Sequence, residues 1–154
     1  MAILPITIYP NPILKKKTQK IKDPGDPEVR ELILDILETM EKNEGVGLAA
    51  NQVGKSVRLS VVRYEGRTYI LINPKIKSKS WKKVILEERC LSFPGVAIPV
   101  KRHAKISVEA QNKSGKKVII KADGMLARIF QHEIDHLDGI PFIKREVKNK
   151  SVKK

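Results

Sequence analysis

The pattern of apolar and polar positions first predicts a long helix near the N-terminus. Its apolar residues recur at intervals of three and four and form one stripe, with charged residues between them. The stripe consists of Val29, Leu32, Ile33, Ile36, Leu37 and Met40. Asp26 can cap the free amides at the start, and Pro27 suits the first helical position. We expect this helix to end near Asn43 and to pack on a sheet as a scaffold.

Six shorter segments show the alternation or the β-branched enrichment that is typical of strands. They span residues 57–63, 68–72, 84–88, 96–100, 105–111 and 116–121. The first two are expected to form a hairpin, and Asn73-Pro74 is expected to end the second of them. A turn at residues 112–115 should join the last two. Prolines interrupt residues 1–25, which predicts an irregular arm.

A second helix is predicted after the last strand. It should begin at Asp123-Gly124 and close at Gly139, with Pro141 just beyond. A chain of 154 residues has the size of one ordinary domain, and it contains no internal repeat or long linker. We therefore expect one domain over residues 1–144, followed by a basic tail, 145–154, that frays.

Composition bears on the compartment in which the protein works. A single cysteine excludes an internal disulfide and fits a reducing environment. No apolar run is long enough to cross a bilayer, and the first residues lack the basic and apolar regions of a signal peptide. These features favour a soluble, cytoplasmic protein with no membrane association.

The net charge of +14 favours a polyanionic partner through long-range attraction. The alternative is that the lysines only keep the surface soluble, because they are spread along the whole chain. No aromatic platform is expected among them, as a single-strand binder would need. We expect general attraction, for example to ribosomal RNA, and no sequence-specific binding of nucleic acid.

The second helix carries the sequence His-Glu-x-x-His between Gln131 and Gly139. Residues four apart lie on one face of a helix, so His132 and His136 can point two imidazoles at one metal ion. Glu133 stands beside the first of them, where its carboxylate can reach a metal-bound water. The alternative is a helix that carries two surface histidines by chance. The chain has only three histidines, and two of them stand at this spacing around a Glu, which favours the metal site.

Cys90 is the natural third ligand, although a lone cysteine is most often a small buried apolar residue. Its neighbours Glu88, Arg89 and Ser92 are polar, and two imidazoles plus one thiolate would leave a fourth position open for catalysis. Glu133 would take a proton from the metal-bound water and later deliver it to a leaving amine.

The attacked carbonyl needs donors for its developing negative charge. The Leu91 amide, directly after Cys90, and the side-chain amide of Gln52 could form this oxyanion hole. Gln52 follows a segment with two glycines, Gly45 and Gly47, where backbone can come close to another group. On its own, that segment fits a tight packing turn and a substrate-lining loop equally well.

Three motifs together make the chain resemble the peptide deformylase family. Residues 45–52 match Gly-x-Gly-Leu-Ala-Ala-x-Gln in full, and residues 131–139 match Gln-His-Glu-x-Asp-His-Leu-x-Gly in full. Residues 88–92 match Glu-Gly-Cys-Leu-Ser except that Arg89 replaces the glycine. Order and spacing agree from about Ile3 to Lys144, which is nearly the whole chain.

The resemblance implies a fold and a reaction. The fold would be α+β, with antiparallel β-sheets packed around a central helix that carries His-Glu-x-x-His, and with a second long N-terminal helix. The reaction would remove the N-formyl group from the N-terminal formyl-methionine of newly synthesised polypeptides, with release of formate. A metal-bound water would attack the formyl carbon, with Glu133 as general base and acid.

The resemblance also implies the residues of the site. Cys90, His132 and His136 would be the ligands of one divalent metal ion, Fe²⁺, whose place Zn²⁺, Ni²⁺ or Co²⁺ can take. Gln52 and the Leu91 amide would hold the formyl oxygen, and Gly47 would belong to the same catalytic group. The C-terminal helix of longer relatives, which docks some of them on the ribosome, is missing, and the basic tail is a candidate substitute.

The methionine side chain of such a substrate needs an apolar pocket. Residues three, four and seven before His132 share its helix face, which makes Met125 and Ile129 candidates for a wall. Arg128 could line the slot with its stem while its head reaches solvent. The full set of candidates is Val46, Leu86, Glu88, Met125, Arg128 and Ile129. Ordinary core packing explains Met125 and Leu86 equally well.

Two other functions fit part of the pattern. A metallopeptidase shares His-Glu-x-x-His, but it usually recruits its third ligand downstream, where this chain offers only Glu146. A ribosome- or RNA-binding protein with a structural metal would need a fourth protein ligand, and His103 is the only spare imidazole.

We also expect that Arg89 does not require a positive φ, since Cys90 beside it must be held accurately.

Overall fold

The computed structural model describes residues 2–148. In chain order its elements are η1 (Pro12–Lys15), α1 (Pro27–Lys42), β1 (Gly47–Ala49), η2 (Ala50–Val53), β2 (Leu59–Tyr64), β3 (Arg67–Lys79), β4 (Lys83–Arg89), β5 (Ala97–His103), β6 (Lys105–Gln111), β7 (Lys117–Asp123), α2 (Gly124–Leu137) and η3 (Phe142–Arg145). Both predicted helices form close to their expected bounds. The Asp26 side chain caps α1 by accepting a hydrogen bond from the Glu28 amide at 2.8 Å.

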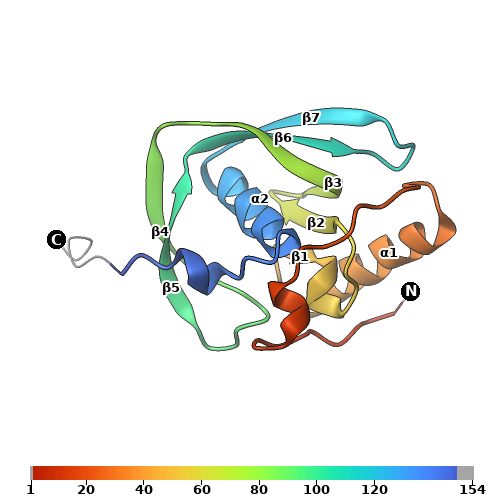
Figure 1. Cartoon of the computed structure of the whole chain (residues 1–154), viewed down its shortest axis with the longest axis horizontal. Helices are drawn as coiled ribbons and strands as arrows, with labels where there is room; N and C mark the ends of the chain where they lie inside the picture. The colour runs from red at the N-terminus through yellow and green to blue at the C-terminus, as the bar shows by residue number, and fades with distance from the viewer. Residues whose placement is uncertain (1, 149–154) are drawn as a thin grey trace.

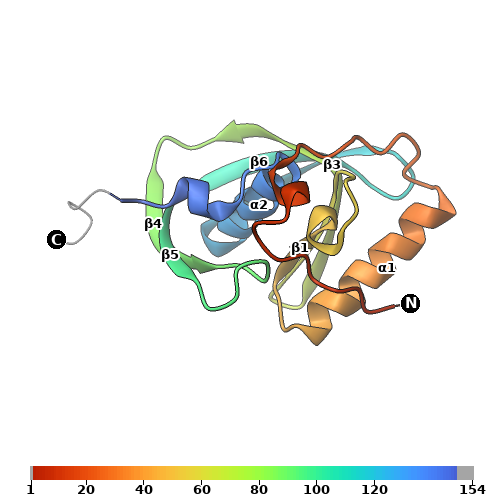
Figure 2. The same ribbon diagram turned by 60° about the horizontal axis from the view of Figure 1, so that its bottom comes forward.

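The strands form two antiparallel sheets around α2, as the α+β prediction required. One sheet has the order β1-β2-β3-β6-β7, and the other consists of β4 and β5. In Figure 1, α2 lies in the middle of the molecule, between the β4–β5 pair and the strands of the larger sheet, and Figure 2 shows α1 apart from it beside β1. Within residues 2–148, no helix is long and apolar enough to span a membrane.

The two helices cover opposite faces of the larger sheet. Successive strand residues point to opposite faces, and Val61 lies in the core formed with α1, whereas Val62 lies in the core formed with α2. Ile72 and Leu71 divide in the same way between the two cores. Because both faces are covered, β2 is apolar on both sides and its first four residues are buried.

The prediction that Asn73-Pro74 ends a strand is wrong. β3 continues to Lys79, because Asn73 adopts a left-handed φ of 52° and the register shifts between Ile72 and Lys75. This irregularity lets the first part of β3 pair with β2 and the second part with β6. The Asn73 side chain also bonds both the amide and the carbonyl of Ile21, at 2.8 Å each.

The C-terminal end of α2 is held by side chains from distant parts of the chain. Asn51 donates to the His136 carbonyl at 2.6 Å, and Thr18 and Arg58 donate to the Leu137 carbonyl at 2.8 and 3.1 Å. These bonds satisfy carbonyls that have no partner within the helix. They fix the last turn of α2, the turn that carries His136.

The start of the basic tail is attached to β5. Glu146 pairs with Val100, and the Val147 amide donates to the Pro99 carbonyl at 2.9 Å. The part of the expected tail at 149–154 lies outside the described residues, so its fraying stays a prediction.

A buried arginine ties α2 to the smaller sheet. Arg128 is only 4% exposed, and its guanidinium donates to Glu88 Oε2 at 2.5 Å, to the Val100 carbonyl at 3.0 Å and to the Val84 carbonyl at 2.6 Å. The prediction that its head reaches solvent is therefore wrong. The head finds one anion and two backbone carbonyls between α2 and β4–β5, which compensate the loss of its hydration.

Replacement of this arginine should destabilise the fold. We expect Arg128→Met to lower the free energy of unfolding by about 2–4 kcal/mol, because it removes a buried charge-assisted bond and leaves the buried Glu88 carboxylate with one cation fewer. Chemical denaturation of the metal-free protein measures the change. Arg89→Met is a matched control, since the Arg89 side chain is 74% exposed, and it should change stability by no more than about 0.5 kcal/mol. Equal stability of the two variants would contradict the role of Arg128.

Candidate active site

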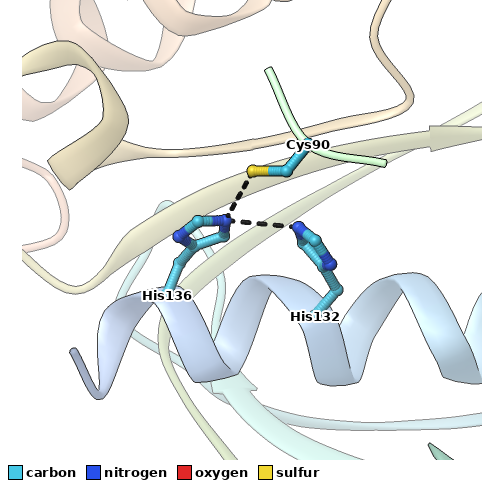
Figure 3. Close-up of side chains that lie close together, drawn as sticks. All are labelled: Cys90, His132 and His136. Atoms are coloured by element: carbon cyan, nitrogen blue, oxygen red, sulfur yellow. Dashed lines mark hydrogen bonds between the residues drawn. The ribbon is translucent and has the colours of Figure 1, made fainter. Parts of the chain in front are cut away.

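The three predicted metal ligands meet at one point. Cys90 directly follows β4, and His132 and His136 stand one turn apart on α2 (Figure 3). His136 Nε2 lies 3.2 Å from Cys90 Sγ and 3.2 Å from His132 Nε2. One ligand atom of each residue lies within 4.8 Å of those of the other two. A thiolate and two imidazoles at this separation fit a single metal ion of the borderline-soft kind.

His132 is oriented by a carboxylate behind it. Its Nδ1 lies 2.9 Å from Glu88 Oε1, so Nδ1 carries the hydrogen and Nε2 is left to face Cys90 and His136. Although burial opposes it, hydrogen bonds to Cys90 and Glu88 raise the pKa of His132 to about 10 in the metal-free chain. Although burial favours the neutral acid, hydrogen bonds with His132 and Arg102 hold the pKa of Glu88 well below its usual range.

Glu88 itself is fixed by two arginines. Arg102 donates to its two oxygens at 2.9 and 3.0 Å, and Arg128 donates to Oε2. Arg102 also reaches Asp135 on α2 at 2.5 Å, and Asp135 accepts two bonds of 3.0 Å from Arg145. Glu88 is thus buried and turned toward His132. It was expected in the substrate pocket, but in the structure it supports a metal ligand from behind.

His136 presents a neutral imidazole to the same point. Burial, followed by the nearby charge of His132, lowers the pKa of His136 well below its usual value. Among the described residues its Nδ1 has no hydrogen-bond partner, while its Nε2 faces Cys90 and His132. A neutral imidazole is the form that binds a metal, so this residue fits the predicted site.

The remaining histidine does not join the cluster. His103 lies at the end of β5, where its Nδ1 is 2.8 Å from the Ser80 carbonyl. The metal-binding group found among residues 2–148 contains Cys90, His132 and His136 alone. The alternative of a closed structural site, with His103 as the fourth ligand, is therefore wrong.

Glu133 packs against the backbone of Gly47. A Cβ on Gly47 would lie 2.6 Å from Glu133 Oε2 and 3.0 Å from its Cδ, so only glycine leaves room for the carboxylate. Burial raises the pKa of Glu133 to about 7, despite the opposing effect of His132. Its Oε1 is buried and has no hydrogen-bond partner within residues 2–148. A carboxylate with a pKa near neutrality can both accept and return a proton.

The two predicted carbonyl-binding donors lie close to Cys90. Gln52 is buried, its Oε1 accepts from the Ala49 amide at 3.0 Å, and its Nε2 lies 3.1 Å from Ser92 Oγ and 3.5 Å from Cys90 Sγ. Leu91 follows Cys90 in a turn, and in the described chain its amide makes no hydrogen bond. Ser92 had no predicted role, although its place in the Glu-x-Cys-Leu-Ser motif could have indicated one.

The apolar pocket candidates occupy different surroundings. Val46, next to Gly47, is 54% exposed, and Leu86, on β4, is 44% exposed. Ile129 is buried in the core formed with α2. Met125 is 44% exposed and lines a groove with residues of β6 and β7. Val46 and Leu86 thus offer exposed apolar surface near the catalytic elements, and Ile129 belongs to the core.

Arg89 fits its position without strain. It is the last residue of β4, pairs with Ala97 of β5, and is absent from the residues with positive φ. Its side chain points outward and lies 3.8 Å from Glu87. The expectation that this position does not require glycine is confirmed.

Several residues of the site were not identified from the sequence. They are Asn51, Ser92, Arg102, Asp135 and Arg145. Ser92 and Asp135 are specified by the motifs, so their motif membership was the available signal, whereas Asn51 stands at a position that its motif leaves open. Arg102 and Arg145 lie outside the motifs, and only the folded structure brings them to Glu88 and Asp135.

Comparison with known proteins agrees with this geometry. The polypeptide deformylase family model matches residues 3–152. A peptide deformylase of Aquifex aeolicus is 45% identical over 146 residues, covering 91% of this chain and 85% of that protein. A peptide deformylase of Dictyoglomus thermophilum is 47% identical over 137 residues, covering 89% of this chain and 88% of that protein.

Solved structures give the same result. The crystal structure of peptide deformylase from Thermotoga maritima superposes with a TM-score of 0.92 at 35% identity, covering 96% of this chain and 99% of that one. The peptide deformylase of Ehrlichia chaffeensis in complex with actinonin superposes with a TM-score of 0.90 at 41% identity, covering 96% and 91%. The match of sequence and fold shows that the chain belongs to the peptide deformylase family.

Proposed function

We propose that this chain hydrolyses the N-formyl group of the N-terminal formyl-methionine of newly synthesised polypeptides and releases formate. Family membership supports this reaction. The observation that carries the proposal is the cluster of Cys90, His132 and His136, with the Glu133 carboxylate on the residue after the first histidine. The same cluster argues against a metallopeptidase that takes its third ligand downstream of the helix.

Cys90 Sγ and the Nε2 atoms of His132 and His136 would hold one divalent metal ion. Ferrous iron is the proposed ion, and zinc, nickel or cobalt could occupy the same mixed sulfur and nitrogen ligands. When bound, such an ion polarises a carbonyl and lowers the pKa of water toward neutrality. The carboxylate of Glu88 would keep the His132 ring in the tautomer that leaves Nε2 free.

Glu133 would move the proton. Its carboxylate takes a proton from the attacking water and delivers it to the amine of methionine as the carbon–nitrogen bond breaks. The pKa of about 7 and the Oε1 that has no hydrogen-bond partner among residues 2–148 support both steps, because the group can be ionised before attack and protonated after it. Gly47 would give this carboxylate its room.

Gln52 and Leu91 would stabilise the negative charge on the formyl oxygen. The Gln52 Nε2 and the Leu91 amide are donors next to Cys90, and preorganised donors of this kind contribute strongly to acyl-transfer catalysis. The bonds of Gln52 to Ala49 and Ser92 would hold its amide in place.

The methionine side chain would pack against Val46 and Leu86. Val46 adjoins Gly47, and on β4 Leu86 shares the strand face of Glu88, which is turned toward α2. Of the two candidates on α2, Ile129 is nearly covered by the core and Met125 lines the groove with β6 and β7, so the proposed wall rests on Val46 and Leu86.

The cytoplasm, and the ribosome within it, are the proposed places of action. The net charge of +14 and the nascent-chain substrate support an encounter with ribosomal RNA through the basic surface, with the tail at 145–154 as one contact. If the tail takes part, a chain that ends at Val147 should cosediment less with ribosomes than the full chain. Equal cosedimentation would remove the tail from the proposal.

Formate release tests the proposed reaction. The metal-loaded protein should release formate and a free methionyl amine from a short formyl-methionyl peptide, with no cleavage of internal peptide bonds. Glu133→Gln should keep its metal but lose on the order of 10²–10⁴-fold in kcat, because proton transfer and not ligation is removed. Metal content by atomic emission, measured on the same samples, separates these effects.

Glu87→Gln is the matched control, since this exposed carboxylate lies on β4 outside the site and should leave formate release unchanged. Loss of metal in Glu133→Gln would show that the carboxylate has a ligating or structural role instead. Internal cleavage of an unformylated peptide would identify a peptidase.

The space at Gly47 gives a second test. Gly47→Ala should displace the Glu133 carboxylate, because its new Cβ would meet Oε2 at 2.6 Å, and should reduce kcat at least tenfold while the metal stays bound. Gly25→Ala is the control, since its nearest atoms lie at an ordinary 3.5 Å. Wild-type kcat in Gly47→Ala would mean that the position of Glu133 does not matter.

A further inference from the structure

The single tryptophan of the chain is 99% exposed. Trp81 lies in the corner between β3 and β4, between Ser80 and Lys82. A large ring normally buries much of its surface in a folded chain, and this one contributes nothing to the core. Its position departs from the expectation that no aromatic platform stands among the lysines.

The corner that presents Trp81 is held by hydrogen bonds on both sides. Ser80 exchanges bonds with Lys105: its amide donates to the Lys105 carbonyl at 2.9 Å, and its Oγ accepts from the Lys105 amide at 3.0 Å. The Lys82 carbonyl accepts from the Ala104 amide at 2.9 Å and from Ser80 Oγ at 2.8 Å. The indole is therefore presented on a fixed backbone, so that little backbone freedom is lost when a ligand covers it.

Exposed lysines without an anionic partner lie close to Trp81 in sequence or on β6 and β7, the strands that follow β3 in the sheet. None of them forms an ion pair with another described residue, whereas Lys75 and Lys77, further back on β3, both pair with Glu109. The unpaired set consists of Lys79, Lys82, Lys83, Lys105 and Lys121.

A groove of about 970 Å³ lies beside this corner, since Ser80, the residue before Trp81, belongs to its lining. Ser78 and Lys79 of β3, Lys105 of β6 and Lys121 of β7 also line it. The hydroxyls of Ser78 and Ser107, both in the lining, lie 2.6 Å apart. Glu65 and Asp123 also line the groove, against four basic side chains. Its lining includes none of the three metal ligands and not Glu133.

We propose that Trp81 and this groove bind single-stranded RNA, with one base stacked on the indole and the backbone phosphates against Lys79, Lys82 and Lys105. Base stacking on an aromatic side chain beside a basic groove is the physical basis of sequence-tolerant binding to single strands. Serine hydroxyls and ammonium groups suit phosphate and 2′-hydroxyl contacts. The proposal goes beyond deformylation and does not depend on it.

A membrane surface fits this region less well. An interfacial anchor needs an apolar face that sinks into the lipid, but the neighbours of Trp81 in sequence are Lys79, Ser80, Lys82 and Lys83.

Fluorescence provides the test, because Trp81 is the only tryptophan. Titration with a single-stranded RNA of about 12 nucleotides should quench the intrinsic emission. Anisotropy of labelled RNA should show that Trp81→Ala binds about 5- to 150-fold more weakly, and that Trp81→Phe loses less. Lys79→Ala and Lys105→Ala should each reduce the salt dependence of binding by about 0.7 in the slope of log K against log salt.

Lys75→Ala is the matched control, because Lys75 is already paired with Glu109, and it should leave affinity and slope near the wild-type values. Equal thermal melting of all variants shows that they are folded. Absence of quenching, or unchanged affinity in Trp81→Ala, would overturn the proposal. A blue shift of the emission with phosphatidylglycerol vesicles but no response to RNA would assign the surface to membranes instead.

Discussion

A single buried carboxylate joins the two halves of the candidate metal centre. Glu88 lies on β4, two residues before Cys90, and it accepts hydrogen bonds from Arg102 on β5 and from Arg128 and His132 on α2. Glu88 needs these partners, because a buried anion without its cations would strongly destabilise the fold. The same group therefore fixes the distance between β4 and α2 and the direction of one metal ligand.

The other parts of the site depend on separate anchors. The carbonyl of His136 is held by Asn51, which follows the segment that begins with Gly45 and Gly47, so the first and third motifs meet at the end of α2. Gly47 then sets how near Glu133 can lie to β1. Ligands and proton carrier are thus held from three sides before any metal binds, which is what preorganised catalysis requires.

Local signals in the sequence predicted much of the fold. The cap at Asp26, the stripe of α1 and the turn at Gly115 depend on neighbouring residues alone, and they occur where expected. The continuation of β3 through Asn73 was missed, because a change of strand partner depends on β6, far along the chain. Gly47–Ala49 was expected as a turn or loop, but it pairs with β2 as an edge strand.

The same distinction holds within the site. Spacing and residue type identified Cys90, His132 and His136, since ligand chemistry depends on few atoms. The spacing of Arg128 and His132 along the helix placed Arg128 on the correct helix face. The surroundings of Arg128 were predicted wrongly, because the sequence does not show which anion a buried guanidinium will meet. Glu88 was assigned to the pocket for the same reason, and Arg102 and Arg145 were not identified at all.

X-ray absorption at the metal edge would test whether Cys90, His132 and His136 together hold one ion. For the zinc-loaded protein, we expect one sulfur at about 2.3 Å and two imidazole nitrogens at about 2.0–2.1 Å, with an oxygen or nitrogen of non-protein origin in the remaining position. Cys90→Ser should remove the sulfur distance. A wild-type spectrum without sulfur, or one with three imidazoles, would contradict the ligand set.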